Sequence, residues 1–230
     1  VKYFQSLDTT VTWAMAGRNL TKLKKVAEDN QTKVEILIAD SDDESALDDL
    51  TARAKVILST TGPFHRYGSK LVASCIKNHA HYVDITGENF WVKGLIEKHH
   101  AEALAKGIRI IPSCGFDSIP SDLGTFFSAK AIGKPIKRIE SFHSYKGGAS
   151  GGTLETMFSM GELDLGDDLT DPFLLNPNDS YSNEQKQLSG DRVGIAKKPE
   201  IKAWSGPFIM ATANTRVVRR TEALLALRQE

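Results

Sequence analysis

The stretch KVILSTTGPFHRYG, residues 55–68, contains the clearest strand-to-helix junction of the chain. Its apolar run, Val56–Leu58, passes through small hydroxyl residues and stops at Gly62-Pro63, a pair typical of turns. Apolar residues at helical spacing follow from Ser69 to Asn78. In α/β proteins, a buried strand that ends in small residues before a helix is a common cofactor position. The surrounding sequence therefore has to show whether this junction belongs to a dinucleotide site.

Strands and helices alternate on both sides of this junction, from Thr10 to about Ser113. Each expected strand is short and rich in Val and Ile, and a stretch of helical character follows it. This alternation indicates βαβ units with helices on both faces of a parallel sheet. We therefore expect an α/β fold with a Rossmann-type doubly wound parallel sheet. The expected strands are 11–16, 34–39, 55–59, 82–85 and 108–112, and the expected helices are 20–28, 44–54, 69–78 and 90–105.

The alternation fades after about Gly124. We therefore expect a Rossmann-type NAD(P)-binding domain at residues 1–124 and an α+β lobe for substrate binding or dimerisation at residues 125–230. Alternating apolar and polar residues predict a half-exposed strand at 136–145, and a second strand is expected at 208–218.

Three features of the second half carry weaker expectations. The glycine cluster at 147–152 precedes a short helix, and it fits an anion site at the helix start or a hinge between lobes. The polar segment 164–199 is expected to be a long excursion. Arg216, Arg219 and Arg220 are interpreted as solvated or salt-bridged.

Composition excludes several functional classes. Lys plus Arg equals Asp plus Glu at 29 each among 230 residues, so charge gives no case for nucleic acid as a partner. No apolar run approaches the roughly 20 residues needed to span a bilayer. Two cysteines, Cys75 and Cys114, make neither a disulfide framework nor a zinc site. We expect a globular protein of the cytoplasm, with peripheral membrane association and homo-oligomerisation left open and no metal.

Small, polar and glycine residues follow every expected strand. In a doubly wound sheet the ligand lies beyond the carboxyl ends of the strands, so these residues are the candidates for cofactor binding. Each glycine taken alone is also explained by an ordinary turn. The candidates are Arg18, Asn19, Asp40, Thr60, Thr61, Gly62, Pro63, Thr86, Gly87, Cys114 and Gly115.

Arg18 is the most specific of these candidates. The residue after the second strand of a dinucleotide fold faces the adenosine ribose, where an acidic side chain favours NAD and an arginine favours NADP. Arg18 therefore predicts NADP, with Asp40 at the adenine side. The alternative is a solvent-exposed arginine at a helix start, where the helix dipole is mildly unfavourable to a cation.

The sequence motifs do not identify a proton donor. The weak catalytic candidates are Tyr67, Glu88 and Asp117. Ser118 is expected to begin a helix with Pro120 in its first turn, so that free N–H groups face the site. Cys114 as a nucleophile is less favoured than a cysteine that serves only packing.

Several of these segments together resemble the saccharopine dehydrogenase-like oxidoreductases, in the branch with the trans-acting enoyl reductases. The segments are Ala16-Gly17-Arg18, Thr60 to Phe64 with Tyr67-Gly68, Tyr82 to Glu88, Cys114 to Asp122, Gly151 to Thr153 and Asn214 to Arg220. The resemblance covers nearly the whole chain. It implies an NADP-type Rossmann domain followed by an α+β substrate lobe.

The resemblance also implies a first strand with a glycine-rich phosphate loop, which this sequence does not contain. That strand lies between the second and fourth strands in the order 3-2-1-4-5-6. We therefore expect the strands at 11–16 and 55–59 to be separated by a slot. We also expect about 20 to 25 further residues before Val1, holding a strand and a G-x-x-G-type turn. Residues 1–230 alone are then expected to bind NADPH poorly.

The expected function is NADP-dependent hydride transfer to a small molecule, such as a lipid-derived carbonyl or enoyl group. The alternative is a non-catalytic relative that binds a dinucleotide and acts through protein or membrane-surface contacts. Saturable NADPH binding without turnover would favour that alternative.

Overall fold

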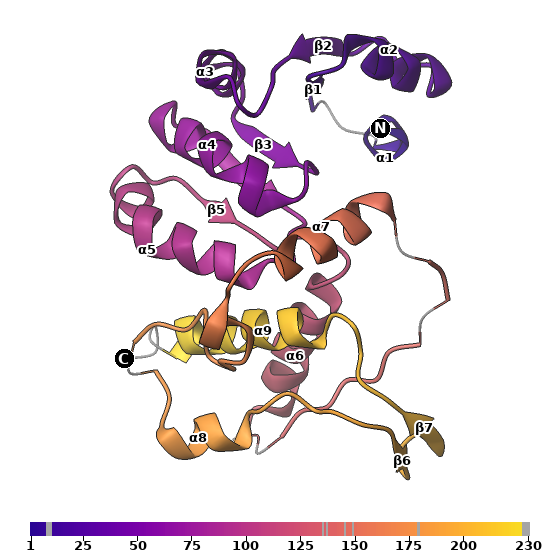
Figure 1. Ribbon diagram of the computed structural model, residues 1–230, viewed down its shortest axis with the longest axis vertical. Coiled ribbons are helices and arrows are strands. Elements are labelled where there is room, and N and C mark those ends of the chain that lie inside the picture. Colours follow the sequence, from indigo (N-terminus) through magenta and orange to yellow (C-terminus); the bar gives the residue numbers. More distant parts are fainter. Residues whose placement is uncertain are drawn as a thin grey trace.

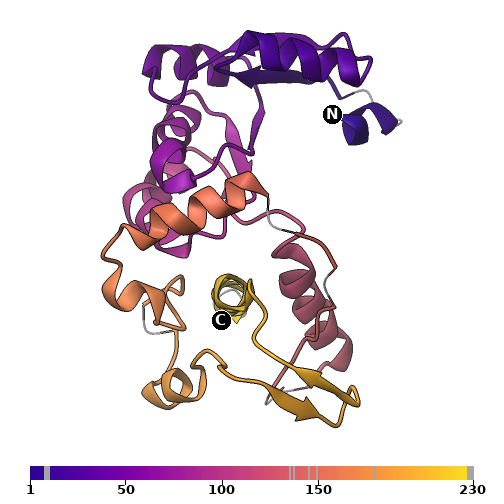
Figure 2. The same cartoon turned by 45° about the vertical axis from the view of Figure 1, so that its right-hand side comes forward.

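The computed structural model describes residues 1–7, 11–134, 136, 138–144, 146–148, 150–178 and 180–226. A part that carries the parallel strands occupies the upper half of Figure 1, and a mostly helical part lies below it. Figure 2 shows helix α7 lying across the junction of the two parts.

The N-terminal part has the alternation that the sequence predicts. Each of the five expected strands and four expected helices is present. The strands are β1 (Ala14–Gly17), β2 (Glu35–Ile38), β3 (Val56–Ser59), β4 (His81–Asp84) and β5 (Ile110–Ile111). The helices are α1 (Lys2–Ser6), α2 (Leu20–Asp29), α3 (Glu44–Ala52), α4 (Phe64–Lys77) and α5 (Asn89–Ala105).

Local caps explain where two of the helices start. The Asn19 side chain accepts a hydrogen bond from the Lys22 N–H at the start of α2, and Asp43 accepts one from the Ala46 N–H at the start of α3. Helix α4 has no such local cap and begins at Phe64, earlier than the expected Ser69. Its first N–H groups are accepted by a distant carboxylate, which is described below.

The parallel strands form two separate sheets. One contains β1 and β2, with Gly17 opposite Ile38, and the other has the order β3-β4-β5. In the described residues no ladder joins β1 to β3. The prediction that these two strands are not hydrogen-bonded neighbours is therefore confirmed. They correspond to the second and fourth strands of the 3-2-1-4-5-6 order.

Helices α4 and α5 pack on one face of the three-stranded sheet. Tyr82 and Val72 are fully buried in the resulting core. On the opposite face Val56 and Leu58 are 52% and 54% exposed, so the described helices do not cover it. Helices are expected on both faces, but the described helices cover only one face of this sheet.

Gly68 allows α4 and α5 to pack closely. A Cβ at this position would lie 2.5 Å from the Trp91 ring, whose Nε1–H donates to Ser69. The indole is buried and fixed by this hydrogen bond, so it cannot easily move aside. We expect Gly68→Ala to lower the free energy of unfolding by about 1 to 3 kcal/mol, as overpacking does, measured by urea denaturation.

Gly94, in α5, is the matched control for that substitution. A Cβ there meets no atom within 4 Å. Ala is the better helix former, so Gly94→Ala should be neutral or stabilising by up to about 1 kcal/mol. Equal losses for both variants would contradict a steric role for Gly68.

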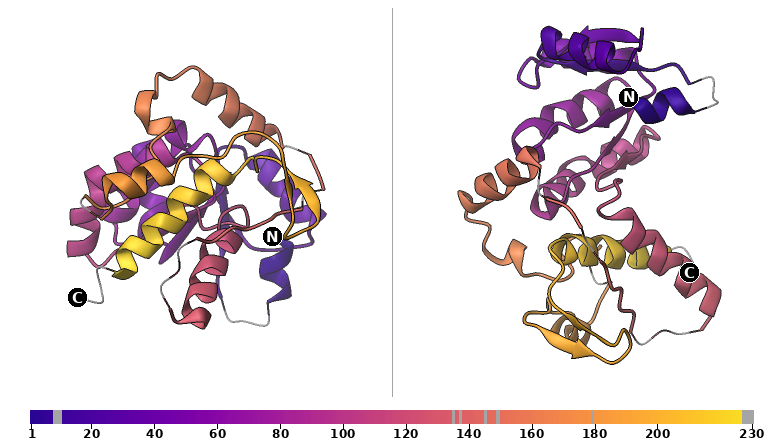
Figure 3. Two further views of the ribbon diagram at one scale, coloured as in Figure 1. Left: turned by 90° about the horizontal axis from the view of Figure 1, so that it is seen from below. Right: turned by 90° about the vertical axis from the view of Figure 1, so that its right-hand side faces the viewer.

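The second part contains helices, a short hairpin and long irregular connections. Its elements are α6 (Ile119–Ile132), α7 (Gly151–Gly161), η1 (Gly166–Leu169), α8 (Asn183–Leu188), β6 (Ala196–Lys198), β7 (Ala203–Ser205) and α9 (Ala211–Ala226). Strands β6 and β7 are antiparallel, and α9 packs against α6. Figure 3 shows α9 beside α6 from two further directions. Gly124, the expected domain boundary, lies inside the continuous α6.

Two strand predictions for this part are wrong. Residues 136 and 138–144 form no strand, and Pro135, Lys137 and Tyr145 lie outside the described residues. Among the described residues, no ladder includes this segment, although its Glu140 forms an ion pair with Lys198 of β6. The predicted strand at 208–218 is largely helix, because α9 begins at Ala211.

Candidate functional site

The carboxyl ends of the parallel strands place the predicted cofactor residues in two groups. Gly17 pairs with Ile38 in one sheet, and Ser59 pairs with Asp84 in the other. The segment after β5 joins the second group, because the Cys114 N–H donates to the Asp84 carbonyl at 2.7 Å. We call the residues beyond these ends the strand-end site: Arg18, Asn19, Asp40, Thr60, Thr61, Gly62, Pro63, Thr86, Gly87, Cys114 and Gly115.

Arg18 and Asp40 follow two hydrogen-bonded strands and form one end of the strand-end site. The Arg18 side chain is exposed and makes no hydrogen bond or ion pair with any described residue. Asp40 is half-buried, and its carboxylate accepts from the Asp42 N–H at 3.1 Å. Asn19 serves as the cap of α2. The free cation of this group is therefore Arg18.

The segment between β3 and α4 leaves two threonines open to solvent. Thr60 and Thr61 are exposed, whereas Pro63 is buried at the helix start. Gly62 lies under α7, where an added Cβ would be 3.7 Å from the Thr156 hydroxyl. This segment therefore has an accessible side next to a helix of the second part.

Glu88 is the long-range cap of α4. Its side chain is 1% exposed, and its two oxygens accept the N–H groups of Phe64 at 2.7 Å and His65 at 2.8 Å. One of these oxygens also lies 2.6 Å from His65 Nδ1. A carboxylate is well placed at a helix N-terminus, where unpaired N–H groups and the helix dipole favour negative charge. Glu88 thus joins the ends of β3 and β4.

A second buried carboxylate organises the other loops. Asp84 is 1% exposed, and its Oδ1 accepts the N–H groups of Thr86 at 3.0 Å and Ser113 at 2.9 Å. The Ser113 hydroxyl donates to the Thr86 carbonyl at 2.7 Å. Burial raises the pKa of the Asp84 carboxyl above its usual value. Thr86 is itself buried, so its side chain lies below the surface of the strand-end site.

Ser113 is held in an uncommon backbone conformation by these bonds. Its φ is 57°, in the left-handed region that few non-glycine residues adopt. The next segment approaches β4 closely, since a Cβ on Gly115 would lie 2.7 Å from Ile85 Cγ2. Gly115 is thus required by packing, whether or not it touches a ligand.

The remaining candidates are accessible but differ in their surroundings. Cys114 is exposed, whereas Cys75 is buried and its pKa is raised to about 12 by that burial. Tyr67 is half-buried and Asp117 is exposed, and neither side chain is held by a hydrogen bond within the described residues. The Glu88 carboxylate differs from both, because three donors already occupy it.

Helix α9 fastens the second part to the strand-end site. The Asn89 amide donates to the α9 carbonyl of Ala213 at 3.1 Å. Asn214 reaches back and donates to the Asp117 carbonyl at 2.7 Å and to the Ser121 hydroxyl at 3.1 Å. These residues are separated by about a hundred positions in sequence, so no local pattern could reveal the contact.

Helix α7 is held over the same region by charge pairs. Arg66 in α4 lies 2.8 Å from Glu162 and 3.6 Å from Glu155. The glycine cluster at 147–152 ends inside this helix, because α7 begins at Gly151 and Ser150 caps it. Ala149 lies outside the described residues. The anion-site and hinge interpretations of this cluster remain predictions.

The interpretation of three C-terminal arginines as solvated or salt-bridged needs correction. Arg216 is salt-bridged, to Asp191, but it is only 1% exposed. Its guanidinium also donates to the carbonyls of Asp171 and Leu169. Arg219 and Arg220 donate to further backbone carbonyls, and burial lowers the pKa of both. These arginines hold the polar excursion at 164–199 in place.

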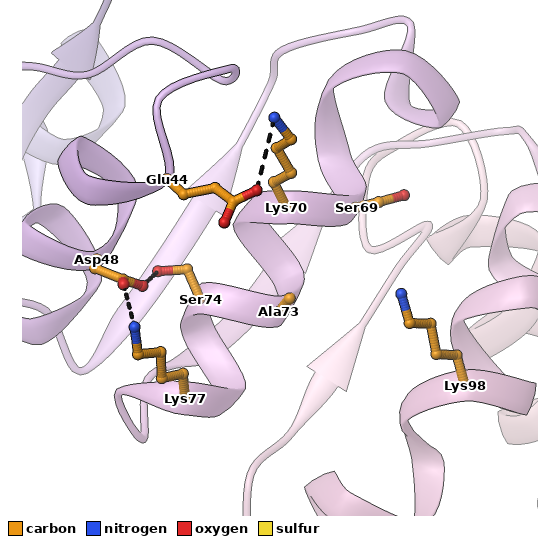
Figure 4. A pocket seen from close by; sticks show the side chains of 8 residues that line it. All are labelled: Glu44, Asp48, Ser69, Lys70, Ala73, Ser74, Lys77 and Lys98. Atoms are coloured by element: carbon orange, nitrogen blue, oxygen red, sulfur yellow. Dashed lines mark hydrogen bonds and ion pairs between the residues drawn. The ribbon is translucent and has the colours of Figure 1, made fainter.

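A surface hollow lies away from the strand ends. This groove of about 280 Å³ is lined by residues of α3, α4 and α5 (Figure 4). Its charged side chains pair with one another, Asp48 with Lys77 and Glu44 with Lys70. The bond with Lys77 lowers the pKa of Asp48. Ion pairs between neighbouring helices therefore account for these charged side chains without a ligand.

The described residues contain neither a metal-binding cluster nor a membrane-spanning helix. No group of three or more His, Cys, Asp or Glu side chains is arranged to hold a metal ion in this part of the chain. None of the described helices has the length and apolar character needed to cross a membrane.

Comparison with known families identifies the N-terminal part. Residues 2–111 match the family described as "Saccharopine dehydrogenase NADP binding domain". This range contains β1 to β5 and ends with the last of them. Residues 2–111 thus resemble this domain, and we call them the NADP-binding domain. The resemblance seen in the sequence and the predicted NADP-type Rossmann fold are therefore confirmed for this domain.

Relatives of the NADP-binding domain cover almost the whole chain. A Mycobacterium tuberculosis protein whose name provisionally places it among trans-acting enoyl reductases is 37% identical over 92% of this chain. The trans-acting enoyl reductase of Mycobacterium leprae is 33% identical over 94%. The match covers 54% and 56% of these two proteins, so the chain spans about half their length.

A solved structure also resembles the chain. It is apo histidine-tagged saccharopine dehydrogenase (L-Glu forming) from Saccharomyces cerevisiae, with a TM-score of 0.49 and 19% identity. The match covers 58% of this chain and 28% of that one.

Arg18 fits the cofactor for which the NADP-binding domain is named. The 2′-phosphate of NADP needs a cation beside the adenosine ribose, and Arg18 is an exposed, unpaired cation beyond β1. The described residues contain no glycine-rich turn between β1 and β3 that could hold the pyrophosphate. The fit therefore rests on Arg18, and the roles of the other residues of the strand-end site stay predictions.

The His65–Glu88 pair is the feature of the NADP-binding domain that sequence reasoning missed. Glu88 was a candidate proton donor, and His65 was not considered. The signal lay in the HRYG segment directly after Gly62-Pro63, but a histidine at a helix start is uninformative until its partner is known.

Proposed function

We propose that the protein is an NADP-dependent oxidoreductase that transfers a hydride between NADPH and a small-molecule substrate. One observation carries this proposal: the free Arg18 guanidinium lies directly beyond β1 of an NADP-binding domain. In this position an arginine pairs with the 2′-phosphate that distinguishes NADP from NAD. The relatives' names, which refer to enoyl reductases, support a redox activity.

The strand-end site offers a place for each end of the cofactor. Arg18 and Asp40 would hold the adenosine. The exposed segment Thr60–Gly62 and the loop at Gly87 would line the nicotinamide end, with Cys114 and Gly115 alongside. When bound, NADPH supplies a hydride, and the protein must then place the substrate and deliver a proton.

The substrate class we propose is a lipid-derived carbonyl or enoyl group. The names of the relatives point to an enoyl group. An apolar surface is available beside the strand-end site, because Phe116 follows Gly115 and is 88% exposed. Such a surface suits an acyl chain better than a charged amino acid.

Arg18→Ala tests the cofactor assignment. We expect NADPH binding to weaken while NADH binding stays nearly unchanged, because only NADPH carries the 2′-phosphate. A hydrogen bond to a charged group contributes about 1.5 to 3 kcal/mol, so the loss should be roughly 10- to 150-fold. Fluorescence titration of the full-length protein with both cofactors measures the effect.

Arg53→Ala is the control for this substitution. Arg53 is also exposed, but it pairs with Glu35 at the opposite end of β2, at 2.7 Å. NADPH affinity should be unchanged in this variant. Equal losses for NADPH and NADH in Arg18→Ala would exclude the 2′-phosphate role. Saturable NADPH binding without oxidation by any carbonyl or enoyl compound would support the non-catalytic alternative.

A further inference from the structure

His65 is a side chain held in a fixed orientation, and it lies close in sequence to the predicted nicotinamide end. It follows Pro63 and belongs to the first turn of α4. Its side chain is 11% exposed, and its ring lies 5.5 Å from the Phe90 ring. The neighbouring loop residues Thr60 and Thr61 are exposed. The imidazole is thus confined but lies beside an open surface.

The contacts of Glu88 determine which imidazole nitrogen faces it. Both Glu88 oxygens already accept a backbone N–H, from Phe64 and from His65. An ionised carboxylate only accepts, so the 2.6 Å contact with His65 requires Nδ1–H as the donor. In the neutral ring the lone pair is then on Nε2.

Nε2 is the available end of this ring. It makes no hydrogen bond with any described residue, and it is not among the described polar atoms that are both buried and unpaired. A ring held at Nδ1 by a buried carboxylate and open at Nε2 can carry a proton at a defined place. This arrangement is the one that general acid–base catalysis requires.

We propose that His65 is the proton donor of the reaction, acting through Nε2, and that Glu88 is the residue that positions its ring. The inference rests on the proposed function. Reduction of a carbonyl or enoyl group consumes one hydride and one proton. The cofactor supplies the hydride and is oxidised. The Nε2–H bond of the imidazolium breaks, its proton goes to the substrate, and the neutral ring is protonated again from water.

Other charged groups around His65 are engaged elsewhere. Arg66, the next residue of α4, faces Glu155 of α7 and Glu162, which directly follows α7. Glu88, at the start of α5, is the carboxylate that contacts the ring. The contact that fixes the His65 ring therefore comes from Glu88 and not from the charged groups near α7.

Nitrogen-15 NMR of the imidazole groups tests the orientation without turnover. In the full-length protein without cofactor, the His65 signal, assigned by its loss in His65→Gln, should show the Nδ1–H form that the contact with Glu88 requires. Addition of NADP⁺ should shift the His65 Nε2 signal but not that of His100, an exposed residue of α5. A protonated Nε2 with an accepting Nδ1, or no shift on adding NADP⁺, would overturn the proposal.

Kinetics with 2-enoyl thioesters of short and long acyl chains, and with the corresponding aldehydes, give the second readout. His65→Gln should keep NADPH affinity within about 3-fold and reduce the turnover number by about 100- to 10,000-fold, the usual contribution of general acid–base catalysis. His100→Gln should behave as wild type. Turnover of His65→Gln at the wild-type rate would overturn the proposal while leaving the proposed function intact.

Glu88→Gln tests the positioning of the His65 ring by Glu88 separately from the capping of α4. We expect its His65 signal to lose the fixed Nδ1–H form and its turnover to fall at least about 10-fold, with a changed pH profile. Failure of wild type to bind NADPH would instead refute the proposed function. If the thioesters and aldehydes are not reduced, the two NMR observations alone decide the role of His65.

Discussion

Arg216→Met should lower the free energy of unfolding by about 3 to 5 kcal/mol, as expected when one partner of a buried ion pair is removed. The Arg216 side chain is 1% exposed and forms two bonds with Asp191, one of them 2.8 Å long. Its Nε–H also donates to the Asp171 carbonyl at 3.0 Å. Methionine fills much of the same volume but leaves these acceptors without a donor. Urea denaturation followed by circular dichroism measures the change.

A surface arginine from the same region provides the control. Arg192 lies 2.6 Å from Glu140, but its side chain is 62% exposed. Exposed ion pairs contribute about 0 to 1 kcal/mol, so Arg192→Met should have little effect. Proteolysis should also cleave the segment between α7 and α9 sooner in Arg216→Met than in wild type. A loss below about 1 kcal/mol in Arg216→Met would contradict its anchoring role.

Asp84→Ala should lower the free energy of unfolding by about 2 to 4 kcal/mol. The substitution removes the acceptor of two buried backbone N–H groups, on Thr86 and Ser113. Each buried donor left unpaired costs about 1 to 3 kcal/mol. NADPH affinity should fall as well, because these bonds hold the loops beside Gly87 and Cys114. Denaturation and fluorescence titration of the same preparation measure both effects.

Asp84→Asn is the matched control, because the amide oxygen can still accept both N–H groups. This variant should retain stability within about 1 kcal/mol of wild type, since both backbone hydrogen bonds are kept. Wild type and Asp84→Asn differ in how their free energy of unfolding responds to pH. Burial raises the pKa of Asp84, so the folded protein holds this proton more tightly than the unfolded chain.

The sign of this effect is testable. The extra stability of wild type from proton binding is complete below about pH 3.8, the ordinary pKa, and is lost as pH rises through the raised value. Wild type should therefore lose stability relative to Asp84→Asn as pH increases from about 4. A constant difference between the two would mean that the carboxyl titrates alike in folded and unfolded states.

The architecture of the NADP-binding domain can be predicted from local sequence patterns. Strands and helices from β1 to β5 follow from local periodicity, because short apolar runs and helical spacing are properties of neighbouring residues. The separation of β1 from β3 also followed from the sequence, through the strand order of the fold. Arg18 was placed correctly beyond β1 because a residue that directly follows a strand lies at its carboxyl end.

Helix α9, in contrast, depends on contacts with segments that are distant in sequence. Its buried positions include Asn214 and Arg216. Its buried face thus combines apolar residues with polar ones, and the segment 208–218 is predicted from the sequence as a strand. Polar side chains face inward here because carbonyls and a carboxylate from distant segments satisfy them.

The role of Glu88 was likewise decided by tertiary contacts. From the sequence alone, Glu88 is a candidate proton donor and is not distinguished from Tyr67 and Asp117. In the fold its carboxylate caps α4 and fixes the His65 ring, because β3 and β4 bring together two segments separated by more than twenty residues. Which side chain is held and which is free depends on these long-range hydrogen bonds, and local sequence carries no record of them.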